Sequence, residues 1–233
     1  MAHLSRRELK TDEFMSGLDA AWEYCLEHRR LLITAGVIVV VVALAVWGGL
    51  SWRQHRLHQA QSELAQGLEL YHATISTQPL PNGQPSFPTA TARAQAALAK
   101  FRAAAAYRGT RPGRLARYYS ALAEIDAGHG ARGAAGLKRL SGSSHANLAA
   151  LARAALANYE LSQGNDAEAA TQFRQLLAHP APAVPRATIL WQLAGIESHR
   201  DPSAAQQLYR QIVQQYPNSQ TAQAAAQRLG QNP

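Results

Sequence analysis

The sequence has very few of the residues that crosslink small folds or build zinc sites. Among its 233 residues there is a single cysteine, Cys25. One cysteine cannot form an internal disulfide framework, and it cannot supply a zinc site that needs several cysteines. The folded state must therefore be stabilised by the packing of side chains.

Motifs of catalysis are missing as well. The sequence holds neither a Gly-x-Ser-x-Gly motif nor a glycine-rich loop of the kind that cradles phosphates. His55 and His58 can share one helix face, but no acid or third histidine follows at helical spacing, and a metal site needs about three or four ligands. We therefore expect a protein that is not an enzyme and has no metal, no cofactor and no small-molecule substrate.

Strand patterns are rare in the sequence. Alanine, leucine and glutamine dominate, while alternating runs of Val, Ile and Thr are scarce, which favours an all-α fold.

Residues 53–233 carry an excess of positive charge, with 18 Lys and Arg against 9 Asp and Glu. These cations are spread singly rather than clustered with stacking aromatic residues, so we interpret them as a solvated basic surface and expect no nucleic-acid partner.

One long hydrophobic run stands out, at residues 31–52, with 22 residues and no charge. As a helix it is about 33 Å long, enough to cross a hydrocarbon core of about 30 Å, so we predict a transmembrane helix and a lipid-bilayer partner. Trp47 and Trp52 and the flanking arginines suit the headgroup regions. The small-x-small spacing Ala43-Leu44-Ala45 lies inside the run, which favours an uncleaved signal anchor over a cleaved signal peptide.

Residues 1–30 are predicted to be a cytoplasmic tail. They hold five Lys and Arg, whereas the first 24 residues after the run hold only Arg53 and Arg56, a bias that places the N-terminus inside. Positions spaced like one face of a helix carry apolar side chains in this tail: Phe14, Leu18, Trp22 and Cys25. We therefore expect a single-pass protein of the bacterial inner membrane, with residues 53–233 in the periplasm.

Residues 53–233 contain an internal repeat of 36 residues. A large apolar residue followed by a basic one recurs at this interval: Phe101-Arg102, Leu137-Lys138, Phe173-Arg174 and Tyr209-Arg210. Residues 115–128 and 151–164 match at the same offset, each beginning Leu-Ala-Arg and ending in Gly. Two different helices thus share one period, and such helix pairs bury their apolar stripes only by stacking, so the repeat predicts a helical solenoid.

Prolines divide the repeat region. The segment 78–89 holds four prolines and is predicted to be a loop between a helix at about 53–77 and one at about 90–108. A further break is expected at Arg111-Pro112-Gly113. The last helix, 219–229, is expected to cap the stack.

The second helix of each unit resembles that of the tetratricopeptide repeat (TPR). In that repeat a small residue is followed by an aromatic residue four positions on and an aliphatic residue or alanine three further, as in Ala97, Phe101 and Ala104. The unit around Leu137 has Gly133 at the small position and matches least well. With its tail, span and repeats, the chain resembles membrane-anchored tetratricopeptide proteins that include the ancillary subunit of the bacterial Sec translocon.

This resemblance implies a periplasmic, chaperone-like or translocon-associated domain that contacts secreted proteins or chaperones. It also implies a partner-binding groove on the first helix of each pair, with these inward residues: Tyr118, Leu122, Ile125, Asn158, Leu161 and Trp191. Ordinary core packing is an equally good interpretation for any single one. A scaffold or assembly factor of another envelope complex, docking through its tail and span, is the alternative function.

Our first prediction concerns topology. Protease added to intact spheroplasts of the native host should digest residues beyond about 53, because the Lys and Arg bias favours an N-terminus that stays inside. Immunoblotting against the C-terminus measures the loss. Protection of that part in spheroplasts, with digestion only after lysis, would reverse the orientation.

Overall fold

The computed structural model describes residues 29–78, 80 and 83–231, and it divides the chain into two units, 1–56 and 57–233. Helix accounts for 79% of the described residues. The predicted predominance of helix is therefore confirmed. The amphipathic tail predicted at 1–30 lies almost wholly outside the described residues, so its apolar face stays a prediction.

The first unit contains most of the long helix α2 (Arg29–Tyr71). Within the described part of the chain it is the one helix that is long and apolar enough to cross a membrane, and its apolar stretch is not buried against the protein. Val39 and Trp47 are 66% and 70% exposed. The Arg56 guanidinium carbon lies 4.8 Å from the centre of the Trp52 ring, a cation–π contact.

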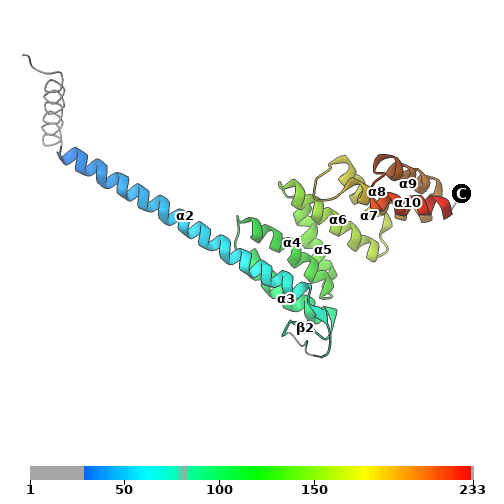
Figure 1. Ribbon diagram of the computed structural model, residues 1–233, viewed down its shortest axis with the longest axis horizontal. Coiled ribbons are helices and arrows are strands. Elements are labelled where there is room, and N and C mark those ends of the chain that lie inside the picture. Colours follow the sequence, from blue (N-terminus) through cyan, green and yellow to red (C-terminus); the bar gives the residue numbers. More distant parts are fainter. Residues whose placement is uncertain (1–28, 79, 81–82, 232–233) are drawn as a thin grey trace, which may run out of the picture. The chain divides into compact units, whose positions relative to one another are not determined.

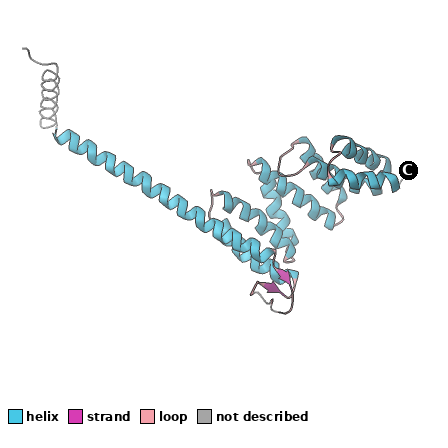
Figure 2. Ribbon diagram, in the orientation of Figure 1, coloured by secondary structure: helices cyan, strands magenta, loops and turns pink. Residues whose placement is uncertain are grey.

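The second unit is a row of helices in which each helix packs on the next one along the chain, while α4 also contacts α6 and α8 also contacts α10 (Figure 1). Its helices after α2 are α3 (Ala90–Ala105), α4 (Arg111–Asp126), α5 (Gly130–Ser141), α6 (Ala146–Ser162), α7 (Asp166–Ala178), α8 (Arg186–Arg200), α9 (Pro202–Gln215) and α10 (Gln220–Gln231). Two short strands, β1 (Thr74–Ile75) and β2 (Ser86–Phe87), form a small parallel pair (Figure 2).

Two predicted boundaries were wrong. The helix expected to reach residue 77 ends at Tyr71, because the chain leaves it to form β1, and Arg93 donates a hydrogen bond of 3.3 Å to the Ala73 carbonyl oxygen. The break expected at Arg111-Pro112-Gly113 is instead the first turn of α4. There the Thr110 hydroxyl accepts a hydrogen bond from the Gly113 N–H, and proline costs little because its missing N–H has no intrahelical acceptor.

The predicted register is confirmed by burial. The large residues of the four repeats, which lie on α3, α5, α7 and α9, are all buried: Phe101, Leu137, Phe173 and Tyr209. The small residues four positions earlier are buried too: Ala97, Gly133, Ala169 and Ala205. The helix faces that the 36-residue period predicts to be buried are therefore the buried faces in the structure.

The core consists of four clusters, each built mainly from consecutive helices. The clusters join α2, α3 and α4; then α4, α5 and α6; then α6, α7 and α8; and finally α8, α9 and α10. Helices α4, α6 and α8 each belong to two clusters, so every large register residue is covered by its own unit and a neighbouring one. Apolar burial of this kind is the main stabilising term in a chain without crosslinks.

Two of the four basic residues beside the register have a partner on the following helix. Arg102 on α3 forms an ion pair with Glu124 on α4, and Arg174 Nη2 donates a 2.7 Å hydrogen bond to Glu197 Oε1 on α8. The Glu160 carboxylate, one repeat after Glu124, instead accepts a 2.7 Å hydrogen bond from Asn165 Nδ2. The repeated cation thus links one unit to the next at two of its four positions.

The glycines that end α4 and α6 repeat in conformation as well as in sequence. Gly128 and Gly164 have φ values of 89° and 76°, the left-handed region that glycine adopts without a steric penalty. In both turns the residue after the glycine donates its N–H to the carbonyl of a glutamate, His129 to Glu124 at 2.8 Å and Asn165 to Glu160 at 2.9 Å. This is the Schellman ending of a helix, formed twice with the same register.

Gly133 allows α5 to approach α4 closely. A Cβ atom at this position would lie 2.4 Å from the Ala121 carbonyl oxygen and 2.5 Å from Ile125 Cγ1. Even alanine is therefore too large here, which explains why this unit departs from the alanine found in the other repeats. By contrast, a Cβ atom at Gly195 on α8 would meet nothing within 4 Å.

Our second prediction compares these two glycines. Gly133→Ala should lower the free energy of unfolding by about 1–3 kcal/mol, the range for overpacking a core. Gly195→Ala should raise it by about 0.5–1 kcal/mol, because alanine favours the helix at an open position. Urea melts of the full-length protein measure both, and a gain in stability at Gly133 would contradict the close contact.

Our third prediction concerns the register. Phe173→Ala should cost about 3–5 kcal/mol of unfolding free energy, because it removes a buried ring from the core. Arg210→Ala on the exposed side of α9 should change stability by less than about 0.5 kcal/mol. Equal losses for the two variants would show that the helix phase is wrong.

Candidate functional site

A groove runs between α4 and α6 in the second unit, and we call it the α4–α6 groove. Its volume is about 500 Å³. Its walls are mostly apolar and aromatic, with Asp126 as the one charged lining residue. The following residues line it: Tyr118, Leu122, Ile125, Asp126, Leu151, Ala154, Ala155, Asn158, Tyr159, Ser162, Ala183, Val184 and Pro185.

Helical spacing positions the two walls. Tyr118, Leu122 and Ile125 follow one another at intervals of four and three residues and so share one face of α4. These three side chains are half-buried and also pack against the core cluster of α4, α5 and α6. The groove is therefore the outer surface of that core. Both interpretations of these residues, core packing and groove lining, hold at once.

The polar groups of the groove are held in place. The Tyr71 hydroxyl donates a hydrogen bond to Asp126 Oδ2, and burial together with this bond raises the pKa of Tyr71. Burial, with a smaller effect of neighbouring Tyr119, also raises the pKa of Tyr118. Both phenols are therefore neutral at physiological pH. Asp126 has a hydrogen-bond partner and is not a free anion in the groove.

The structure brings together four of the six residues predicted for the groove: Tyr118, Leu122, Ile125 and Asn158. Leu161 does not line the groove. It is the equivalent of Ile125 one repeat later, and it packs against the core cluster of α6, α7 and α8. Trp191 packs against Tyr209 with ring centres 5.4 Å apart, in the cluster of α8, α9 and α10. We therefore remove Leu161 and Trp191 from the proposed groove.

The sequence interpretation missed most of the α6 wall and all of the loop that ends the groove. Leu151, Ala154 and Ala155 precede Asn158 at helical spacing, so extending that pattern backwards along α6 would have found them. Val184 and Pro185 belong to the connection between α7 and α8, where the Val184 N–H donates to the Ala181 carbonyl at 3.1 Å. A loop of this kind carries no periodic signal.

A second pocket lies among α3, α4 and α5, and we call it the cationic pocket. Its volume is about 750 Å³, and five arginines line it: Arg102, Arg108, Arg117, Arg132 and Arg139. The sequence interpretation treated the cations as singly spread, and at this place that was wrong. The arginines come from α3, the turn after it, α4 and α5, so only the packing of these elements reveals the cluster.

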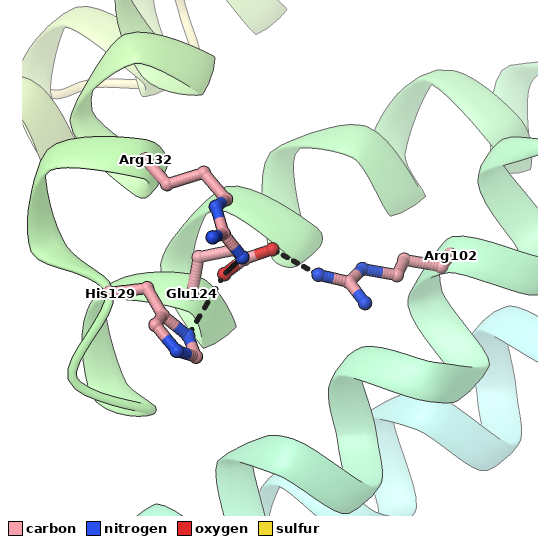
Figure 3. Close-up of polar contacts among 4 residues, drawn as sticks. All are labelled: Arg102, Glu124, His129 and Arg132. Atoms are coloured by element: carbon pink, nitrogen blue, oxygen red, sulfur yellow. Dashed lines mark hydrogen bonds and ion pairs between the residues drawn. The ribbon is translucent and has the colours of Figure 1, made fainter.

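Glu124 is the one carboxylate of the cationic pocket and is 7% exposed. Arg102 bonds its Oε1 atom, while its Oε2 atom lies 3.2 Å from His129 Nδ1 and 3.5 Å from Arg132 Nη1 (Figure 3). These partners come from α3, from the turn after α4 and from α5. A buried carboxylate needs such compensation because water no longer solvates it.

Within residues 29–78, 80 and 83–231, no three His, Cys, Asp or Glu side chains lie close enough together to hold a metal ion. In the comparisons with known proteins, no protein family, curated protein or solved structure matches this chain at a significant level.

Proposed function

We propose that this protein is a membrane-tethered, non-enzymatic binding module of the tetratricopeptide type, whose α4–α6 groove binds an apolar segment of another protein. The observation that carries this proposal is the groove itself: an open, mostly apolar surface on a row of stacked helices, with Asp126 as its one charged lining residue. Stacked helical repeats commonly use such surfaces for binding.

The lining of the groove favours one kind of occupant. Aromatic and aliphatic side chains release water on contact with apolar surface, while the Asn158 amide and the Tyr118 hydroxyl can bond polar groups at its edge. The apolar face of a partner helix, or an extended apolar stretch of an incompletely folded passenger protein, has the matching chemistry. Charged segments do not, because their charges would lose water without gaining partners.

The proposed location follows from α2 and from the flanking charges. We place α2 across the inner membrane, the N-terminus in the cytoplasm and the second unit in the periplasm. There its partners are secreted proteins, periplasmic chaperones or the Sec translocon itself. Exposed apolar side chains along α2 and the stacking of Arg56 on Trp52 support the tether. The excess of Lys and Arg in residues 1–30 supports the orientation.

A second candidate function is a scaffold or assembly factor of another envelope complex, docked through the tail and α2. Side chains such as Val39 and Val41 on α2 are more than half exposed, so this helix is open to the transmembrane helices of a partner as well as to lipid. In that case the groove would have no binding role, and the two candidates predict crosslinks from different parts of the chain.

Our fourth prediction tests the groove in the full-length protein. A photoreactive amino acid at Ser162, which is exposed and lines the groove, should crosslink a partner protein in membranes of the native host. Asn158→Glu combined with Tyr118→Glu should lower this crosslinking about tenfold or more, because carboxylates disfavour an apolar occupant. Gel analysis of the crosslinked product measures the effect.

Gln175→Glu is the matched control, since it adds the same charge at an exposed position of α7 outside the groove lining. It should leave crosslinking unchanged. Asn158→Glu alone, at an exposed position, tests the groove without disturbing the packing of Tyr118. Crosslinks that form from Val41 but never from Ser162 would instead favour the scaffold.

A further inference from the structure

The cationic pocket is unused by the proposed function and has an uncompensated charge. Its five arginines face a single lining carboxylate, Glu124. The side chains of Arg108 and Arg139 make no hydrogen bond or ion pair with any residue that the structure describes, and the Arg117 side chain makes only a long 3.4 Å bond to the Gly113 carbonyl. Three guanidinium groups therefore remain available to a ligand.

The ion pairs of Glu124 hold together the helices that form the pocket. Glu124 already engages Arg102 and Arg132, which join α3 and α5 to α4 (Figure 3). A Cβ atom at Gly136, also in the pocket wall, would lie 3.1 Å from Ala121 Cβ, so α5 lies close against α4 here. Arg117 and Arg139 are thus carried by helices whose spacing is fixed, and Arg108 lies in the turn that joins α3 to α4.

The floor of the pocket contains a further polar atom without a partner. The Ser120 hydroxyl oxygen is buried, lines the pocket and has no hydrogen-bond partner among the described residues. Buried hydroxyls are normally bonded, so Ser120 leaves an unpaired donor beside the pocket. The free guanidinium groups are donors, and Ser120 provides one more donor. A ligand rich in acceptor oxygens fits this arrangement.

We propose that the cationic pocket binds an acidic peptide segment through several carboxylates. Guanidinium groups pair with carboxylates and phosphates through two parallel hydrogen bonds. A compact phosphate is commonly held by N–H groups at a helix N-terminus. Here the wall includes Ala105 and Arg139, in the last turns of α3 and α5, so these helix ends offer the pocket guanidinium groups rather than free N–H groups. Arginines spread over three elements suit charges spread along a peptide.

This site is separate from the α4–α6 groove, because it uses a different face of α4. Arg117, Ser120 and Glu124 lie on the pocket face, whereas Tyr118 and Leu122 lie on the groove face. A partner with an apolar segment and an acidic stretch can therefore contact both sides of one helix. The two sites remain independently testable, since neither shares a lining residue with the other.

Our fifth prediction uses purified full-length protein in detergent and a fluorescent ten-residue peptide of alternating Glu and Ser. Fluorescence anisotropy should show saturable binding that weakens as salt is raised, because exposed charge pairs are screened. The same peptide with Gln in place of Glu should not bind. Arg108→Gln combined with Arg139→Gln should weaken binding about tenfold, as expected for two lost exposed charge pairs.

Arg210→Gln combined with Arg228→Gln is the matched control, because it removes the same charge from exposed positions outside the pocket. It should leave affinity within about twofold. Equal weakening by both double variants would show only a general attraction to a basic protein and would overturn the proposal. Inorganic pyrophosphate that displaces the peptide at a lower concentration than free unlabelled peptide would overturn it too, since the pocket would then be a phosphate site.

Discussion

The close contact between α4 and α5 at Gly133 is the constraint on which the described second unit most depends. With no room for a Cβ atom, the two backbones approach until Gly133 faces the Ala121 carbonyl. The large residue one turn later, Leu137, then fills the space beside the contact and is fully buried. Alanine occupies the equivalent buried position in the other repeats. The spacing of the two helix backbones thus determines which side chains are buried in the core.

Helix α4 shows how much follows from that spacing. Its small residues Ala116 and Ala123 are buried in the core cluster shared with α3. The remaining faces are then directed to two different surfaces, the apolar groove beside α6 and the cationic pocket between α3 and α5. Glu124 lies where three elements meet, and the guanidinium groups of Arg102 and Arg132 offset the cost of removing a carboxylate from water. One helix supports both candidate sites.

Most of the fold could be predicted because the sequence repeat reflects the packing of each unit on the next. A residue such as Phe173 recurs at a fixed interval because each unit must present the same shape to its neighbour, so period and burial coincide. The groove was predictable along α4 for the same reason. Trp191 was misplaced because its unit slips relative to the others, and the ring turns to Tyr209 instead.

Other features had no counterpart in any local pattern. The cationic pocket collects side chains from Arg102 to Arg139, and no periodic rule states that separate arginines converge. The loop that ends the groove depends on the path between α7 and α8. The end of α2 at Tyr71 depends on the pairing of β1 with β2, which lies inside the proline-rich segment 78–89. Each of these is set by contacts between segments that are distant in sequence, which composition and spacing do not encode.

The division of the core into four neighbouring clusters has a consequence for how the second unit forms and comes apart. Nearly all of its apolar contacts join helices that follow one another, so the loops closed during folding are short and their entropic cost is small. Chains of this kind fold rapidly and open in segments from an end rather than all at once. Helix α10, which packs only on α8 and α9 among the described helices, is such an end. Local opening of α10 leaves the α4–α6 groove in place, because no residue of this helix lines the groove.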